Sequence, residues 1–454
     1  MPKFKDYNQN QIQLLPPDLS SLIEKDHIAR LINQIIDEMD LSFIENTYAT
    51  NGQHAYHPKM LFKTLVYGYT IGLRNSRKLA DRLTEDIIFM WLSGRQTPDF
   101  RTIADFRKDK LGDVKKAFTA VLSLCRELGM IRVGKVCLDG TKIRAAANGN
   151  KMQYRKTLNK RGDKIKQQVD EILAEAEAID RAEEKLYGNH TEHRTGIDIS
   201  EVQKKLAKMR QHKQTLEKNR KKLEAKKSII NSKLRKMRKD RNSYASADKD
   251  ATMMLMKEGY IAPGYNAQFA TEHQVILAYN VSPDRNDQKQ LKPMVKEIKE
   301  NTGKKPEIIP ADAGYGNKSN YRFLNNQRIA AFIPYNNFNR EITERNKGIY
   351  EPTKDKELAK YKFRQKIRLL SPEGKALMKQ RREDIEPTIG DIKRNMNFRT
   401  FHLRGQPKCL TEIGLVSIGH NLKKIKSWVK KLAKWDDGRQ KGIELGIVLG
   451  YRLA

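Results

Sequence analysis

Long apolar segments and paired cysteines are what this sequence lacks. No apolar run in its 454 residues approaches the roughly 18 residues that a membrane-spanning helix needs. The first ten residues, MPKFKDYNQN, lack the apolar stretch of a secretion signal. The three cysteines, Cys125, Cys137 and Cys409, are odd in number and widely spaced, which is typical of a protein without structural disulfides or a zinc site. These absences predict a cytoplasmic protein.

Acidic residues are few relative to basic ones. The chain has 89 Lys and Arg against 55 Asp and Glu, a net charge of +34. Residues 1–100 hold 11 Lys and Arg against 12 Asp and Glu, so the whole excess lies downstream. A charge this large predicts a polyanionic partner, with a merely soluble basic surface as the alternative.

Two aspartates follow short apolar runs, in the segments VCLDG (Asp139) and IIPADAGY (Asp312). Residues 133–138 and 307–311 are predicted to form short strands that end at these aspartates, beside glycine. A carboxylate at a strand end is held rigidly and still reaches solvent, which suits Mg²⁺. Taken singly, each segment is more often a simple turn than a ligand site.

A third acidic segment, RREDIEPTIGDIK, contains Glu386. Lys379, Arg382 and Lys393 lie seven before, four before and seven after this glutamate, so an unbroken helix would place all of them on one face. Pro387 argues against that helix and predicts that a new helix starts there. A carboxylate among cations suits a metal ligand flanked by groups that hold nucleic-acid phosphates.

The Arg-x3-Glu-x6-Lys spacing, the LDGTKI and ADAGY segments and the following NFRTFHLRG resemble bacterial insertion-sequence transposases of the Asp-Asp-Glu class. The resemblance implies a ribonuclease-H-like fold in which Asp139, Asp312 and Glu386 hold two Mg²⁺ ions, or Mn²⁺ in their place. Arg382 and Lys393 would then hold the phosphates of the DNA end. Lys379 departs from the commonest family pattern, which has tyrosine at that position.

The resemblance also implies an activity and partners. The enzyme would cut double-stranded DNA at terminal inverted repeats and join the freed ends to target DNA, acting on paired ends as a homodimer or larger assembly. Two alternatives stay open: a metal-dependent nuclease of the same fold, and a non-catalytic DNA-binding protein such as a decayed transposase.

Residues 1–130 are predicted to form an all-helical N-terminal domain. Apolar residues recur at helical spacing from Ile28 to Met39, after two possible caps at Ser20 and Ser21. A second helix opens at Pro58, and the turn GLRN leads into a third helix that begins SRKLADRL. This pattern suggests a helix-turn-helix, although plain bundle packing explains such a turn more often than DNA contact does. The resemblance to the transposases implies that this segment contacts DNA. The candidate DNA contacts are Arg74, Arg77 and Lys78.

The predicted catalytic domain begins at residues 131–160 and is interrupted by an antiparallel coiled-coil hairpin at 161–245. Apolar residues repeat at four-three spacing from Ile165, and Ser200 with Gln203 predicts a capping box for the second helix. Residues 201–241 hold 17 Lys and Arg against 4 Asp and Glu. This charge is interpreted either as a phosphate-binding surface or as a solubilising one.

Residues 246–454 are predicted to complete the catalytic domain, in an α/β fold that is α+β overall. YNAQFATEHQVILAYNVS predicts two strands joined by a turn, and Asp287 is interpreted as a helix cap rather than a catalytic acid. Residues 336–379 are predicted to be a surface connection. A closing helix with a basic end follows, on which Glu412 is interpreted as a helix-face residue and not a metal ligand.

Overall fold

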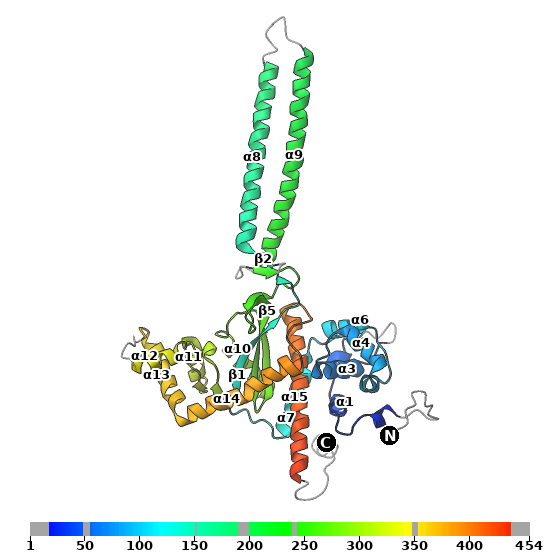
Figure 1. The fold of residues 1–454 in the computed structure, drawn as a ribbon, viewed down its shortest axis with the longest axis vertical. Coiled ribbons are helices and arrows are strands. Elements are labelled where there is room, and N and C mark those ends of the chain that lie inside the picture. The colour runs from blue at the N-terminus through cyan, green and yellow to red at the C-terminus, as the bar shows by residue number, and fades with distance from the viewer. Residues whose placement is uncertain are drawn as a thin grey trace, which may run out of the picture. The chain divides into compact units, whose positions relative to one another are not determined.

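The structure, a computed structural model, describes residues 18–48, 55–149, 152–188, 199–237, 243–346 and 353–436. The chain divides into two compact units (Figure 1). Residues 1–146 and 254–454 form the first, called here the main unit, and residues 147–253 form the second, the hairpin unit. Both helices and an antiparallel sheet are present, so the fold is of mixed α+β type, with a helical N-terminal region as predicted.

The described residues of the N-terminal region of the main unit form helices and short helical turns. Helix α1 (Ile28–Glu38) is capped by the ring nitrogen of His27, which accepts a hydrogen bond from the Ala29 N–H. The predicted serine caps are wrong because Ser20 and Ser21 lie in the short 3₁₀ turn η1 (Leu19–Leu22) upstream. The remaining elements are α2 (Ser42–Glu45), α3 (Pro58–Thr70), α4 (Ser76–Glu85), α5 (Ile87–Leu92), α6 (Phe100–Asp105), the π-helical turn η2 (Phe106–Lys110) and α7 (Val114–Glu127).

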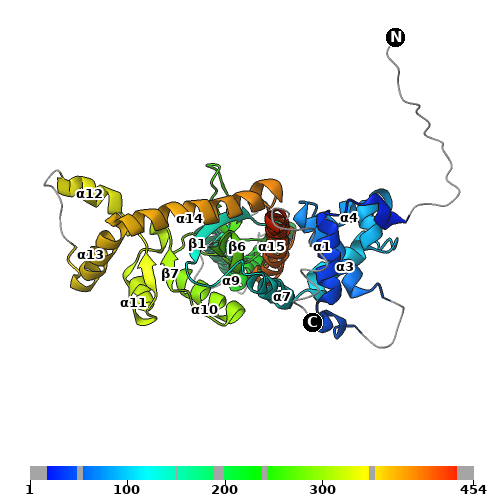
Figure 2. The same ribbon diagram turned by 90° about the horizontal axis from the view of Figure 1, so that it is seen from below.

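The central sheet is built on one long strand, β5 (Ile261–Glu272). It pairs antiparallel with β1 (Cys137–Arg144) and β6 (Val275–Ser282), and it also neighbours β4 (Thr252–Leu255). The two predicted strands of this segment, with a turn at His273, are confirmed. Nearly every residue of β5 is buried because α10 (Leu291–Thr302) and α14 (Pro372–Gly390) both contact it, from opposite faces of the sheet (Figure 2).

Two parallel strands extend this arrangement beyond β1. β7 (Ile308–Pro310) pairs in parallel with β8 (Ala330–Phe332), and the helix α11 (Lys318–Asn326) connects the two strands along the chain. Isolated parallel bridges join Lys135 to Ile308 and Leu138 to Ala311, so β7 lies alongside β1.

The predicted surface connection at 336–379 is wrong. The described part of it forms α12 (Phe338–Asn346), α13 (Lys356–Leu370) and the first half of α14. Leu369 and Leu377 from these helices pack on Phe332 of β8. These helices bury few apolar side chains, so their sequence shows no amphipathic pattern. Polar helices of this kind cannot be told from a loop by hydrophobic periodicity.

The predicted closing helix is confirmed as α15 (Gln406–Asp436). It packs against α3 and α7 on one side and against β6 on the other, so it joins the N-terminal helices to the sheet. The residues predicted as a separate N-terminal domain therefore lie in the same compact unit as the sheet. No helix in the described ranges is long and apolar enough to cross a membrane.

The hairpin unit consists of α8 (Arg155–Gly188) and α9 (Ile199–Lys236), which pack along each other, and of the short antiparallel pair β2 (Met152–Tyr154) and β3 (Ser243–Ala245) (Figure 1). Ile165 and Leu234 of the predicted seam pack against a buried cluster of Leu158, Ile230 and Met237. The predicted cap at Ser200 is wrong because α9 already begins at Ile199.

Candidate active site

Asp139 and Asp312 are brought side by side by strand pairing. The parallel bridge between Leu138 and Ala311 joins the residues that directly precede them. β1 continues through Asp139, so the prediction that this aspartate ends a strand is wrong. The carboxylate of Asp139 accepts a hydrogen bond from its neighbouring Gly140 N–H at 2.8 Å. Burial raises the pKa of Asp139 to about 6, with Arg381 opposing the rise and the charge of Asp312 adding to it.

Asp312 follows β7 and caps the 3₁₀ turn η4 (Ala313–Tyr315). Its carboxylate accepts a hydrogen bond from the Gly314 N–H at 2.9 Å. Burial raises the pKa of Asp312; Arg381 lowers it and nearby Asp287 raises it further. Two adjacent carboxyl groups that both resist ionisation are typical of a site that binds a cation.

Asp287 belongs to this neighbourhood, and its interpretation as a helix cap is wrong. The N-cap of α10 is Gln290, without a side-chain capping bond. The Asp287 carboxylate instead accepts hydrogen bonds from Asn266 at 2.7 Å and Gln268 at 2.6 Å, both on β5. The Asp-x-x-Gln spacing matches a capping box, which is a local contact, and gave no sign of the long-range contacts with β5.

Gly140 explains why Asp287 can approach so closely. A Cβ atom at Gly140 would lie 2.2 Å from the Gln268 amide nitrogen and 2.4 Å from the Asp287 carboxylate. Any side chain there would push Asp287 and Gln268 away from the strand that carries Asp139. Glycine next to Asp139 is therefore required by packing within the strand and not by a turn.

Glu386 lies on α14, which runs without interruption to Gly390, so the predicted helix start at Pro387 is wrong. Proline removes a helical hydrogen bond and frees the carbonyl four residues earlier. Here that carbonyl, Glu383 O, accepts a hydrogen bond from the Gln274 side chain at 2.9 Å. Asp384 fixes the same helix by accepting from the backbone N–H groups of His273 and Gln274 at 2.6 and 2.8 Å.

Arg381 connects Glu386 with Asp139 and was not among the predicted residues. Its guanidinium lies 3.0 Å from an Asp139 oxygen and 4.0 Å from a Glu386 oxygen. Only 8% of the Arg381 side chain is exposed, against 57% of Glu386. Helical spacing from Glu386 favoured the neighbouring Arg382 instead. Arg381 faces the sheet, and its contact with Asp139 cannot be predicted from spacing along the chain.

The three predicted ligands are carboxylates, which Mg²⁺ prefers, but their oxygens do not converge on one point. In the described residues, no group of three or more His, Cys, Asp and Glu side chains is close enough to hold a metal ion. Asp139 and Asp312 supply hard oxygen donors with raised pKa values, which a divalent cation would lower again. The Arg381 guanidinium supplies the positive charge between Asp139 and Glu386.

The cations predicted to surround Glu386 fall into two kinds. The Lys393 ammonium donates to the Lys142 carbonyl of β1 at 3.0 Å, and burial lowers its pKa. Lys379 and Arg382 are exposed on α14, and Lys379 lies 3.8 Å from Glu383. Arg382 lines a cavity of about 580 Å³ together with Arg381, Lys375 and other residues. Lys393 lies in η5 (Asp391–Asn395), the π-helical turn after α14, and ties that turn to the sheet, whereas Arg382 faces the cavity.

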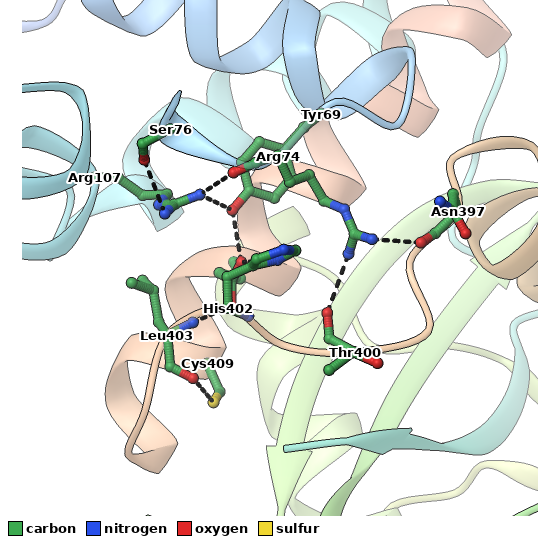
Figure 3. Close-up of polar contacts among 10 residues, drawn as sticks. Tyr69, Arg74, Ser76, Arg107, Asn397, Thr400, His402, Leu403 and Cys409 are labelled. Carbon is green, nitrogen blue, oxygen red and sulfur yellow. Dashed lines mark hydrogen bonds and ion pairs between the residues drawn. The ribbon is translucent and has the colours of Figure 1, made fainter. Parts of the chain in front are cut away.

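The candidate DNA contacts of α4 divide in the same way. Arg77 and Lys78 are exposed in its first turn, and the Arg77 guanidinium lies 4.0 Å from the centre of the Phe100 ring. Arg74 is 7% exposed. Its guanidinium donates to the carbonyls of Asn397 and Thr400 (Figure 3). This burial and bonding do not fit the predicted phosphate contact.

Arg74 is part of a buried polar network between the N-terminal helices and the segment after α14. The Glu412 carboxylate, fully buried on α15, accepts from the Tyr69 hydroxyl at 2.7 Å and from the N–H groups of His402 and Leu403. Arg107 donates to Tyr69, to the Arg74 carbonyl and to Ser76 (Figure 3). Glu412 is thus a buried structural residue of α15.

Two family models match the chain. Residues 17–109 match a transposase domain (DUF772), and residues 248–422 match a transposase DDE domain. The protein is therefore a DNA transposase in general class. The match to the DDE domain is consistent with an insertion-sequence transposase of the Asp-Asp-Glu class, the family that the motifs resemble. No curated protein and no solved structure matches it.

Proposed function

We propose that this chain cuts DNA at the ends of an insertion sequence and joins them to target DNA, on a ribonuclease-H-like sheet that uses Mg²⁺ or Mn²⁺. The observation that carries the proposal is the parallel bridge beside Asp139 and Asp312. Three antiparallel strands (β1, β5, β6) followed by two parallel ones (β7, β8) are the order of that fold. The aspartates lie at its first and fourth strands, and Glu386 is on a helix across the sheet.

Asp139, Asp312 and Glu386 are the residues that would hold the ions. Bound there, Mg²⁺ supplies a positive charge to the attacking and leaving oxygens of a phosphoryl displacement. Asp139 and Asp312 are held in place by their hydrogen bonds to Gly140 and Gly314, and the more exposed Glu386 would supply the third carboxylate from α14.

Arg381 keeps the Asp139 carboxylate oriented before DNA arrives. Its Nε atom is buried and has no hydrogen-bond partner among the described residues. The same guanidinium, 3.0 Å from Asp139, would also stabilise a phosphate oxygen bound next to that carboxylate. The exposed Arg382 and Lys379 extend this positive surface along α14.

Arg77 and Lys78 of α4 are the candidate contacts to the terminal inverted repeats. They stand in the first turn of a helix that follows a glycine-containing turn, where a DNA-contacting helix presents its side chains. Cutting two ends together needs two active sites, so the DNA-bound form is a homodimer or larger. We place this work in the cytoplasm, on double-stranded DNA.

The test uses a labelled duplex that carries the inverted repeats flanking the coding frame. Asp139→Asn, Asp312→Asn and Glu386→Gln should each bind this duplex as the parent does and lose at least about 1000-fold in cleavage rate. A Glu373→Gln variant on the same helix is the matched control and should cut normally. Full cleavage by the Asp139 or Asp312 variant overturns the assignment.

A second measurement separates transposition from hydrolysis. A pre-cut end with a free 3′-hydroxyl should be joined to a plasmid by the parent protein and not by the Asp312 variant. Cutting without joining would identify a nuclease of the same fold. Salt-sensitive binding without any metal-dependent cutting would identify a non-catalytic DNA-binding protein.

A further inference from the structure

The charge of the hairpin unit is confined to one half of its length. We call residues 155–169 and 221–235 the base half, next to β2 and β3, and residues 170–185 and 200–220 the tip half. Each segment of the base half carries six Lys and Arg and a single acid. In the tip half, the α8 segment has two basic and seven acidic residues and the α9 segment has seven basic and two acidic ones. The tip half is therefore neutral, and the base half is strongly positive.

The tip half shows how this hairpin neutralises its own charge. The ring of His212 lies 2.9 Å from the Glu175 carboxylate, and Lys213 forms an ion pair with Asp180, both between α9 and α8. Within α9, Arg220 lies 2.9 Å from Glu217. Opposite charges on facing helices favour their association, as in any two-stranded coiled coil.

The base half does the reverse and sets two positive helices against each other. Lys156, Lys160 and Lys164 repeat every fourth residue along one exposed face of α8, and Lys222 is exposed on α9. In the described part of the chain these four lysines form no ion pair. Apolar contacts of Leu158, Ile230 and Met237 hold the helices together despite the repulsion.

This repulsion is unnecessary for a stable or soluble hairpin. The neutral tip half is built from the same two helices, and the chain as a whole carries +34. A positive surface kept at a cost in stability fits a polyanion that removes the repulsion on binding. The 15 residues of the α8 segment span about 22 Å of helix, roughly two-thirds of a turn of DNA.

We propose that the base half of the hairpin is a second DNA-binding surface, which holds the phosphate backbone of duplex DNA without reading its sequence. The proposal rests on the chain's membership of the DNA transposases and needs none of the catalytic assignments. Long lysines along a helix contact phosphates as separate point charges, so the contact fixes the duplex in place and leaves recognition to other parts of the protein.

The experiment compares two full-length variants with the same change in charge. The base variant is K156Q/K160Q/K164Q/K222Q, and the tip variant is K204Q/K205Q/K208Q/K218Q, all at exposed positions. Glutamine keeps a helix propensity close to that of lysine, so both should fold, and circular dichroism and thermal unfolding check this. Affinity for a duplex without terminal repeats is measured between roughly 50 and 200 mM salt, since each lost phosphate contact reduces the salt slope by about 0.9.

The base variant should lose more than about 10-fold in affinity at the lowest salt, and its salt slope should fall by roughly three to four. The tip variant should stay within about 2-fold of the parent. Equal losses in both would show that only net charge matters and would overturn the proposal, as would no loss in either. A base-dependent affinity for anionic lipid vesicles but not for DNA would overturn it too. Because no cleavage is measured, these outcomes are independent of the fate of Asp139 and Asp312.

Discussion

Two carboxylates of the main unit, Asp391 and Asp139, are almost equally buried and differ in what surrounds them. The exposed fraction of the side chain is 15% for Asp391 and 18% for Asp139. Burial raises the pKa of both, but hydrogen bonds from His420, Lys423 and Asn395 outweigh it at Asp391 and lower its pKa. At Asp139 the result is a pKa of about 6.

The difference shows that the number of hydrogen-bond donors around each carboxylate, and not its burial alone, sets the direction of its pKa shift. Asp391 is saturated by donors within the fold, including a His420 ring whose other nitrogen faces the Gln274 carbonyl at 2.9 Å. Asp139 has the Gly140 N–H and the Arg381 guanidinium. The carboxylate that the fold leaves short of donors is the one that a ligand can complete.

The largest effect that this comparison predicts is on stability. Asp391→Asn should lower the free energy of unfolding by about 2–4 kcal/mol, because it leaves the buried His420 and the Lys423 ammonium without a charged acceptor. Asp312→Asn should leave the stability unchanged or raise it, since it removes a carboxylate whose pKa is raised and keeps an acceptor for Gly314. Urea unfolding measures both, and equal destabilisation would contradict the distinction.

A smaller effect is expected from pH. Asp139 must be ionised to bind a cation, and with a pKa of about 6 it is mostly protonated at pH 5 and mostly ionised at pH 7. Cleavage at limiting Mg²⁺ should therefore rise roughly tenfold across this range. The pKa of Asp391 is lowered from its ordinary value of 3.8, so its ionised carboxylate stabilises the fold at every pH above about 3.8. This contribution is lost only as the pH falls below that value. The thermal midpoint, measured in parallel, should show no contribution from Asp391 between pH 5 and 7; a flat rate profile would argue against Asp139 as a ligand.

The smallest effect distinguishes Lys393, which is hydrogen-bonded to the sheet, from the exposed Arg382. Lys393→Gln should lower stability by about 1 kcal/mol through the lost bond to the Lys142 carbonyl. Arg382→Gln should leave stability unchanged, weaken DNA binding a few-fold and reduce the salt slope by about one. If Lys393→Gln changed the salt slope and Arg382→Gln did not, the two roles would be exchanged.

The sequence predicted most elements of the fold because apolar periodicity and glycine-containing turns mark them locally. The strands around His273, the helix after Pro58 and the hairpin seam from Ile165 are all of this kind. The aspartate motifs were also visible, and the pairing of Leu138 with Ala311 agrees with them. What could not be predicted depends on distant partners.

Three particular residues show that limit. Pro387 can stay inside α14 because the Gln274 side chain takes the freed carbonyl, and Gln274 lies more than a hundred positions away. Asp287 is drawn away from its helix by two amides on β5. Arg74 looks like a surface cation at the start of a helix, yet it donates to carbonyls of a segment near the other end of the chain.

The network of Tyr69, Arg107 and Glu412 has a consequence for how such proteins can be divided. Two family models match the chain separately, which suggests interchangeable modules. Yet a fully buried carboxylate of the later segment has its hydroxyl donor in the earlier one, so an isolated fragment of either would carry an orphaned polar group in an opened interior. Recombination between relatives at the boundary after residue 109 would separate Tyr69 and Arg107 from Glu412, so a functional hybrid would need a compatible set of these three residues in its two parents.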